Sequence, residues 1–271
     1  MANVEKLPGL VASDIGGTLS RGVNPIPQFT VDVLNRLVGK SIPVALITGY
    51  NYHTTLGITR DLDEKIILLP QNGTLCVKEK QLIWEYHIPE PEAYELYDYL
   101  DENDLPVIIY KGKNENFKNF YISRNRIPHL TYGFERMFRA NGFKNITGIS
   151  TILPDEIARK TASEIREMVG DKFKVIYSPG TNGSWLEVCH AEVRKDLALK
   201  RLCHELSIPL SEVFYFGDNF NDLEALRIVG FPVLVENASP ELKKEFRTIV
   251  PPVVEQGVGH YLNERYHLDV I

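Results

Sequence analysis

The sequence predicts an α/β protein whose doubly wound parallel sheet is interrupted by an inserted α+β domain. Near both ends of the chain, short apolar runs alternate with helical patterns, which is typical of βαβ units and a parallel sheet. Between about Ile83 and Glu187 the chain instead mixes helical stretches with short strand-like runs. We therefore expect one α/β core formed by residues 1–83 and 188–271, with residues 84–187 inserted as a separate α+β domain.

The first third of the chain supplies three predicted core strands and one helix. Leu10–Ser13 reads as a strand buried on both faces, as in the middle of a parallel sheet. A helix is predicted over Phe29–Gly39, because apolar residues recur there at helical spacing and a glycine ends the pattern. Two further buried strands are predicted at Ile42–Ile47, which ends at Thr48-Gly49, and at Ile66–Leu69, which ends near Gln71-Asn72.

The middle segment has an alternation of its own. Helices are predicted at Glu92–Glu102 and Pro154–Val169. Strand-like runs are predicted at Val107–Tyr110, Asn119–Ile122, Phe173–Tyr177 and Trp185–Cys189. Helices set among short strands in this way indicate an α+β domain.

The core pattern returns after Val193. The predicted elements are helix Lys195–Leu206, strand Val213–Phe216, helix Asp222–Ile228 and strand Pro232–Val235. Active sites of doubly wound sheets lie beyond the carboxyl ends of the strands. We therefore expect the polar residues that follow these strands to gather at one edge of the sheet.

Composition limits the possible functions. The chain has no run of 18 or more apolar residues, so no segment is expected to span a membrane. The N-terminus lacks the pattern of a secretion signal, so a cytoplasmic location is expected. A net charge of −6 argues against nucleic acid as the main partner. The three cysteines, Cys76, Cys189 and Cys203, lie far apart and predict buried thiols rather than disulfides or a zinc site. The oligomeric state stays open.

Four short signals follow one another at predicted strand ends and helix starts. They are Asp14-Ile15-Gly16-Gly17-Thr18-Leu19, Thr48-Gly49, Lys195, and Gly217-Asp218-Asn219-Phe220-Asn221-Asp222. Each is weak alone, because a Thr-Gly is usually a turn and a helical lysine is usually a solvated charge. As an ordered set they resemble the haloacid dehalogenase superfamily, and within it the Cof-type, class IIB sugar-phosphate phosphatases. That resemblance covers essentially the whole chain and makes the inserted domain a cap.

The resemblance implies a covalent phosphatase reaction. Asp14 is implied to be the nucleophile that attacks phosphorus and forms an aspartyl-phosphate. Thr48 and Gly49 are implied to hold the phosphoryl oxygens, as donors aimed at developing charge. Lys195 is implied to pair its positive charge with the nucleophile and the phosphate. The implied substrate is a phosphorylated small metabolite of the sugar-phosphate class.

The resemblance also implies a Mg²⁺ site. Its ligands are the Asp14 carboxylate, the Gly16 backbone carbonyl and Asp218, with Asp222 supporting the metal site from behind. Hard oxygen ligands of this kind suit Mg²⁺. Asn221 is implied to help position the phosphate region.

Gly16 departs from the family pattern. In the family, the aspartate at this position protonates the leaving oxygen and later activates water, and such acid–base catalysis contributes about 10²–10⁴-fold to the rate. Three alternatives follow: a slow phosphatase, an enzyme in which His53, Tyr50 or a cap residue replaces the missing acid, or a silent protein that binds a sugar phosphate. Tyr50 itself stands where the family often has a basic residue.

A rival interpretation comes from Asp-Ile-Gly-Gly-Thr, which also resembles the phosphate loop of actin-fold sugar kinases. That fold needs a strand directly after the loop, whereas 22–27 has the composition of an irregular turn. Lys195 and Asp218 would have no role in a kinase of this type. We therefore prefer the phosphatase interpretation.

Overall fold

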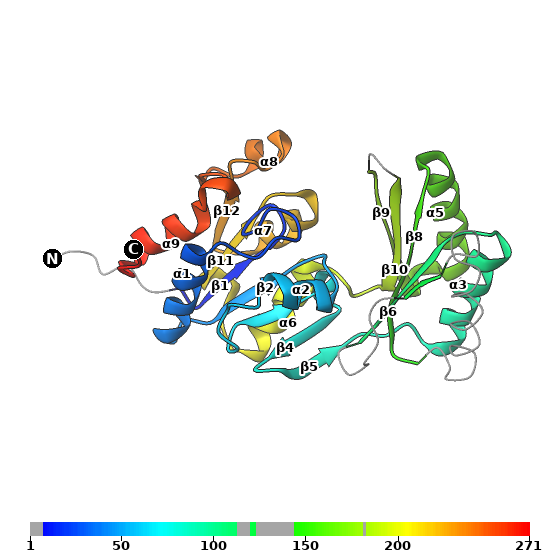
Figure 1. Cartoon of the computed structure of the whole chain (residues 1–271), viewed down its shortest axis with the longest axis horizontal. Helices are drawn as coiled ribbons and strands as arrows, with labels where there is room; N and C mark the ends of the chain where they lie inside the picture. The colour runs from blue at the N-terminus through cyan, green and yellow to red at the C-terminus, as the bar shows by residue number, and fades with distance from the viewer. Residues whose placement is uncertain (1–7, 113–119, 123–143, 181–182) are drawn as a thin grey trace. The chain divides into compact units, whose positions relative to one another are not determined.

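The computed structural model describes residues 8–112, 120–122, 144–180 and 183–271. It divides the chain into two compact units (Figure 1). One contains residues 1–84 and 194–271, and the other contains residues 85–193. The second unit is thus inserted into the first, and the chain crosses between them twice.

The first unit is built on an eight-stranded sheet with the order β13–β12–β11–β1–β2–β3–β4–β5. The pairings from β13 to β3 are parallel, and β4 joins β3 in the antiparallel direction. The strands are β1 (Leu10–Ser13), β2 (Val44–Ile47), β3 (Ile67–Leu69), β4 (Leu75–Lys78), β5 (Gln81–Glu85), β11 (Val213–Gly217), β12 (Phe231–Val235) and β13 (Ile249–Val250).

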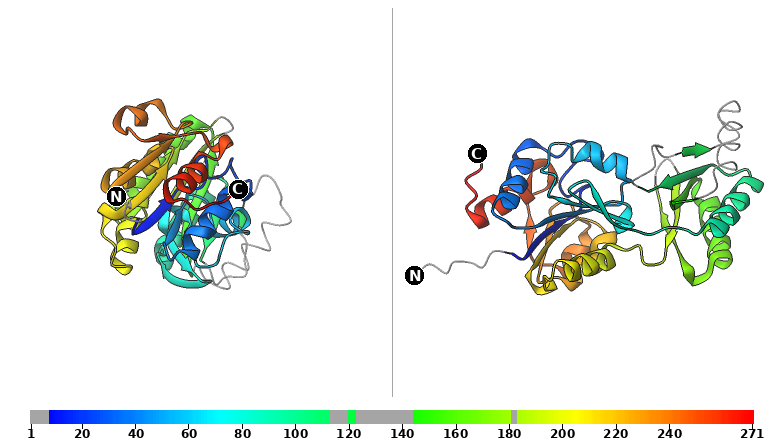
Figure 2. Two further views of the ribbon diagram at one scale, coloured as in Figure 1. Left: turned by 90° about the vertical axis from the view of Figure 1, so that its left-hand side faces the viewer. Right: turned by 90° about the horizontal axis from the view of Figure 1, so that it is seen from below.

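Helices cover both faces of this sheet (Figure 2). On one face, α1 (Gln28–Gly39) packs beside α9 (Gly257–Tyr266), and their apolar side chains join those of the sheet in one core cluster. On the other face, α6 (Lys195–Glu205) packs beside α7 (Leu223–Ile228). The remaining helices of the unit are α2 (Tyr52–Ile58) and α8 (Pro240–Glu245).

The central strand β1 explains why the sheet is sandwiched. All four of its residues are buried, so neither face can be left to water. Leu10 pairs with Val213 of β11 on one side, and Val11 pairs with Val44 of β2 on the other. This arrangement confirms the predicted doubly wound α/β core.

The second unit is the α+β cap. Its sheet is antiparallel, with the order β7–β6–β8–β10–β9. Helices α3 (Glu90–Glu102) and α5 (Asp155–Val169) pack on this sheet through a common apolar cluster (Figure 1). The strands are β6 (Val107–Lys111), β7 (Phe120–Ile122), β8 (Ile146–Leu153), β9 (Phe173–Ser178) and β10 (Ser184–His190).

The sequence did not predict the β4–β5 hairpin that extends the core sheet. Its turn residues, Glu79 and Lys80, have φ values of 49° and 61°. Two-residue hairpin turns with positive φ usually carry glycine or asparagine, and this one has neither. The usual turn signal is therefore missing from the sequence.

Two further expectations concern the chain as a whole. All three cysteines are free and buried, as predicted. Within the described ranges, no helix is long and apolar enough to cross a membrane.

Candidate active site

Two carboxylates meet at the carboxyl edge of the core sheet. Asp14 directly follows β1, and Asp218 directly follows β11. The two strands are parallel neighbours, and near their carboxyl ends Ser13 of β1 is paired with Phe216 of β11. Together with Asp222 they form an acidic cluster in which one oxygen from each residue lies within 4.8 Å of the others. Parallel pairing of the two strands therefore brings together residues about 200 positions apart in sequence.

Lys195 neutralises part of this cluster. It is the first residue of α6, and its side chain is 1% exposed. Its Nζ donates to Asp14 Oδ1 at 2.5 Å and to Asp222 Oδ1 at 2.7 Å. Burial alone opposes its charge, but the two carboxylates outweigh that effect and raise the pKa of Lys195. The lysine is therefore a fixed positive charge beside Asp14.

Asp222 is completely buried, and both of its oxygens are engaged. Oδ1 accepts from Lys195 and from the Tyr215 hydroxyl, which lies 2.7 Å away. Oδ2 accepts from the backbone N–H groups of Asp218 and Asn219 at 3.3 and 3.2 Å. A carboxylate offers about four acceptor positions, so Asp222 has none left for another ligand. It orients Lys195 and the loop that carries Asp218.

Asp14 and Asp218 have less positive charge around them than their burial requires. Burial raises the pKa of Asp14 to about 7, although Lys195 acts in the opposite direction. Burial, followed by the charge of Asp222, raises the pKa of Asp218 to about 6. One buried lysine is therefore too little compensation for three carboxylates, and the cluster is consistent with a metal site.

The loop after β1 is shaped around Asp218. Gly17 has φ +87°, and a Cβ at this position would lie 2.2 Å from Asp218 Oδ2. Thr18 Oγ1 donates to Asp218 Oδ1 at 3.5 Å. Asn237, which the sequence analysis missed, donates from Nδ2 to the Gly17 carbonyl at 2.7 Å. Its only sequence signal is its place just after β12, at the same edge of the sheet.

Thr48 and Gly49 lie at the same edge, after β2. Thr48 is buried, and its Oγ1 accepts from the Tyr50 backbone N–H at 3.2 Å. Asn72 follows β3 with φ 55°, and its amide lies 3.6 Å from the position that a Cβ on Gly49 would take. Among the described residues, Asn72 Oδ1 is buried without a hydrogen-bond partner. A buried acceptor of this kind usually has a partner, so it has room to accept from a water molecule or from a donor group of a ligand.

Tyr50 lies against Gly16. An ideal Cβ on Gly16 would lie 2.7 Å from Tyr50 Oη and 3.0 Å from both Cε2 and Cζ. Burial, then the charges of Asp14 and Asp218, raise the pKa of Tyr50. The phenol is therefore close enough to sense both carboxylates.

Two other predicted residues are exposed. Asn221, expected near the phosphate, lies in the 3₁₀ turn Phe220–Asp222 with its side chain in solvent. His53, one possible substitute acid, lies exposed in the first turn of α2, where its ring is tilted against Tyr52. The structure therefore brings neither side chain into the buried cluster.

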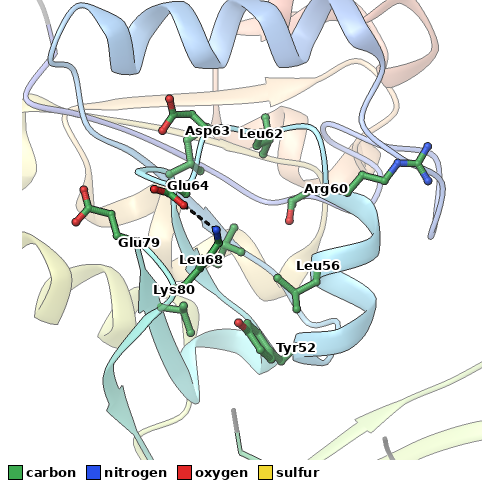
Figure 3. Close-up of a pocket in the computed structure, with 12 residues that line it drawn as sticks. Tyr52, Leu56, Arg60, Leu62, Asp63, Glu64, Leu68, Glu79 and Lys80 are labelled. Carbon is green, nitrogen blue, oxygen red and sulfur yellow. Dashed lines mark ion pairs between the residues drawn. The ribbon is translucent and has the colours of Figure 1, made fainter. Parts of the chain in front are cut away.

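A pocket is formed by a different set of side chains, from α2 to the β4–β5 turn (Figure 3). Its wall is largely apolar and includes Leu56 and Leu68. The exposed ion pair between Lys80 Nζ and Glu64, at 2.8 Å, also borders it. The residues lining this pocket include no member of the acidic cluster, so it is separate from the candidate site.

Known proteins resemble the chain over nearly its whole length. An HMP-PP phosphatase of Yersinia pestis is 25% identical over 264 residues, which cover 94% of each chain. A Buchnera aphidicola protein, provisionally named a phosphatase, is 28% identical over 267 residues, which cover 95% of each chain.

Solved structures share the fold at lower sequence identity. A haloacid dehalogenase-like hydrolase of Bacteroides thetaiotaomicron superposes with a TM-score of 0.80 at 20% identity, covering 96% of this chain and 99% of the other. A sugar phosphatase of haloacid dehalogenase subclass IIB superposes with a TM-score of 0.68 at 17% identity, over the same shares of the two chains. The parallel core sheet with a separate antiparallel cap sheet thus matches class IIB structures.

The family itself is shown by a profile match. The profile described as haloacid dehalogenase-like hydrolase matches residues 11–262, which include the acidic cluster, Lys195 and the whole cap. This match also rejects the sugar-kinase interpretation of the Asp-Ile-Gly-Gly-Thr segment. The chain is therefore a hydrolase that belongs to the haloacid dehalogenase-like family.

Proposed function

We propose that this hydrolase is a Mg²⁺-dependent phosphatase that cleaves a phosphorylated small metabolite, of the sugar-phosphate class, through an aspartyl-phosphate on Asp14. The observation that carries the proposal is the buried contact between Lys195 Nζ and Asp14 Oδ1, beside the second carboxylate of Asp218. The lysine holds one oxygen of Asp14, which orients the carboxylate for attack on phosphorus. The names of the phosphatase relatives support the reaction class.

The residues present fit a magnesium ion. Asp14 and Asp218 are hard oxygen donors whose burial is not matched by positive charge, and Gly17 leaves room for the Asp218 carboxylate. Asp14, Asp218 and the Gly16 carbonyl would hold the ion, with Asp222 supporting them through its contact with the 218 loop. When bound, Mg²⁺ would offset the negative charge of the phosphoryl group and of the two carboxylates.

The remaining residues would bind the phosphoryl group. Thr48 and Gly49 lie at the same sheet edge and offer a hydroxyl and a backbone N–H to the phosphoryl oxygens. Lys195 supplies positive charge from α6. Asn221 would join them by turning its exposed side chain toward the site.

Gly16 makes slow turnover the expected behaviour. With no carboxyl at this position, the family's route for protonating the leaving oxygen is absent, which corresponds to a loss of about 10²–10⁴-fold. An aryl phosphate has a good leaving group and needs little protonation. It is therefore the substrate most suited to reveal activity.

The direct test compares the wild type with Asp14→Asn on an aryl phosphate in the presence of Mg²⁺. We expect turnover and a trapped phosphoenzyme for the wild type, and neither for Asp14→Asn. Asp32→Asn, a substitution on the exposed face of α1, is the matched control and should behave as the wild type. If Asp14→Asn still forms the phosphoenzyme, the assignment of the nucleophile is wrong.

Gly16 also supports a second candidate function. A protein that keeps the phosphate-binding edge but lacks the usual acid could bind a sugar phosphate without hydrolysing it. Thermal stabilisation of the wild type by sugar phosphates, with no turnover of any ester and no phosphoenzyme, would favour this binding protein over the phosphatase.

A further inference from the structure

The two positions at which the site departs from the family pattern are in contact. Gly16 stands where the family has its acid, and Tyr50 stands where it often has a basic residue. The three heavy atoms nearest to a Cβ on Gly16 all belong to the Tyr50 phenol. The phenol ring of Tyr50 therefore fills the space that Gly16, which has no side chain, leaves empty.

The phenol oxygen fills space next to Gly16 that a side chain at this position would need. In an aspartate, each carboxyl oxygen is about 2.4 Å from its own Cβ, as bond lengths require. Tyr50 Oη is 2.7 Å from the ideal Cβ position at Gly16. The hydroxyl therefore occupies part of the volume that an aspartate at this position would need.

Tyr50 is held in place from several sides. Its backbone N–H donates to Thr48 Oγ1 at 3.2 Å, and its carbonyl accepts from the Gln71 N–H at 2.8 Å. Its half-buried ring packs against the apolar core cluster between the sheet and α1. The backbone and the ring of Tyr50 are therefore both held in place beside Gly16.

From this geometry we propose that the Tyr50 hydroxyl replaces the carboxyl that Gly16 lacks and donates its hydrogen to the leaving-group oxygen. This inference rests on the proposed phosphatase function. Asp14 forms the new bond to phosphorus, the P–O ester bond breaks with its electron pair on the leaving oxygen, and that oxygen takes the phenolic proton. Solvent water then returns a proton to Tyr50.

The first experiment measures kcat/KM of Tyr50→Phe on an alkyl and an aryl phosphate. We expect a loss of about 10²-fold for the alkyl ester, which needs a proton, and a much smaller loss for the aryl ester. Tyr52→Phe removes a hydroxyl from the neighbouring tyrosine, which lines the separate pocket, and should leave both rates unchanged. Equal losses for both esters would overturn the donor role and leave only a packing role.

The second experiment tests whether Gly16 and Tyr50 share one space. Gly16→Ala should push the phenol aside and lower the alkyl-to-aryl rate ratio, whereas the same change in a Tyr50→Ala background should lower it no further. The backbone at Gly16 does not have a positive φ, so alanine meets no conformational strain there. Effects that multiply in the double variant would show that the residues act independently and would overturn the inference.

A rescue completes the test. Gly16→Asp in the Tyr50→Ala background has room for its carboxyl and should raise alkyl-ester turnover by about 10²-fold over Tyr50→Ala alone. Failure of this rescue while the variant still forms a phosphoenzyme from the aryl ester would overturn the idea that the two positions share one role. No phosphoenzyme and no turnover in the wild type would instead overturn the proposed function, and the donor role with it.

Discussion

At the scale of single residues, the site is controlled by an imbalance of charge. Asp14, Asp218 and Asp222 gather around Lys195, and only Asp222 has every acceptor position filled. The sequence pointed to these four residues because they belong to short motifs that stand in a fixed order at predicted strand ends and helix starts and that together resemble a known family. It could not predict that Tyr50 lies over Gly16, because that contact depends on how two loops approach each other in space.

The charge imbalance predicts how pH acts on metal binding. In the metal-free protein, the pKa of Asp14 is raised to about 7 and that of Asp218 to about 6, against about 3.9 in an unfolded chain. Between pH 4 and 7 the folded state thus binds more protons than the unfolded state, and its stability falls as pH rises. Because protons and Mg²⁺ compete for these oxygens, the Mg²⁺-induced rise in Tm should be small at pH 5 and large at pH 8.

The control for this measurement separates the site from the cap. Burial also raises the pKa of Glu187 in β10 to about 7, so the metal-free slope alone does not report on the active site. The difference between the Tm values with and without Mg²⁺ does report on the active site. In Asp218→Asn this difference should become small at every pH, and a full Mg²⁺ response in that variant would contradict the metal assignment.

At the scale of elements, local turn geometry decides where the carboxylates point. The turn after β1 bends through Gly17 toward Asp218, and Asn237 after β12 holds the Gly17 carbonyl. The sequence predicted the parallel strands β1, β2, β3, β11 and β12, because strands buried on both faces leave continuous apolar runs, but it missed the buried strand β8 of the cap. It failed at the β4–β5 hairpin, whose turn at Glu79 and Lys80 adopts positive φ without glycine.

This turn geometry gives a matched pair of substitutions. Gly17 and Gly22 both have positive φ, but a Cβ on Gly22 meets no atom within 4 Å, whereas one on Gly17 meets Asp218. Gly22→Ala should lower the free energy of unfolding by about 1–2 kcal/mol, the cost of a left-handed backbone for a residue with a Cβ, and should leave Mg²⁺ binding unchanged. Gly17→Ala should cost clearly more and weaken Mg²⁺ binding, as measured by urea unfolding with and without Mg²⁺. Equal effects of the two substitutions would show that Gly17 serves the backbone alone.

At the scale of the whole molecule, the residues assigned to catalysis and metal binding lie in one unit, and the cap is the other unit. The acidic cluster, Lys195 and Thr48 all belong to the unit of residues 1–84 and 194–271. Its last residue before the cap, Trp84, is anchored there: Nε1 donates to the Gly73 carbonyl at 3.2 Å, and Arg201 lies over its ring at 4.5 Å. In the cap, the aromatic side chains of Tyr94, Tyr97 and Tyr99 pack within the apolar core of that unit.

Replacing residues 85–193 with a short flexible linker should therefore leave a folded core. We expect this shortened protein to unfold cooperatively, to keep its Mg²⁺-dependent stabilisation and to cleave aryl phosphates, because every residue assigned to those steps remains. Preference among sugar phosphates should be lost if residues of the cap select the substrate. Calorimetry and a panel of phosphate esters would show both effects. Retained preference would place the specificity residues in the core.

The insertion also has a consequence for how the chain is made. The central strand β1 pairs with β11, and Leu10 pairs with Val213. Val213 is synthesised only after the whole of 85–193 has emerged from the ribosome. The cap can therefore fold first, because it is a continuous segment. Until synthesis reaches the last third, β1 has one side open, with apolar residues and unpaired backbone groups. The nascent N-terminal segment thus keeps an apolar sheet edge open while residues 85–193 are synthesised, and binding by a chaperone would protect that edge.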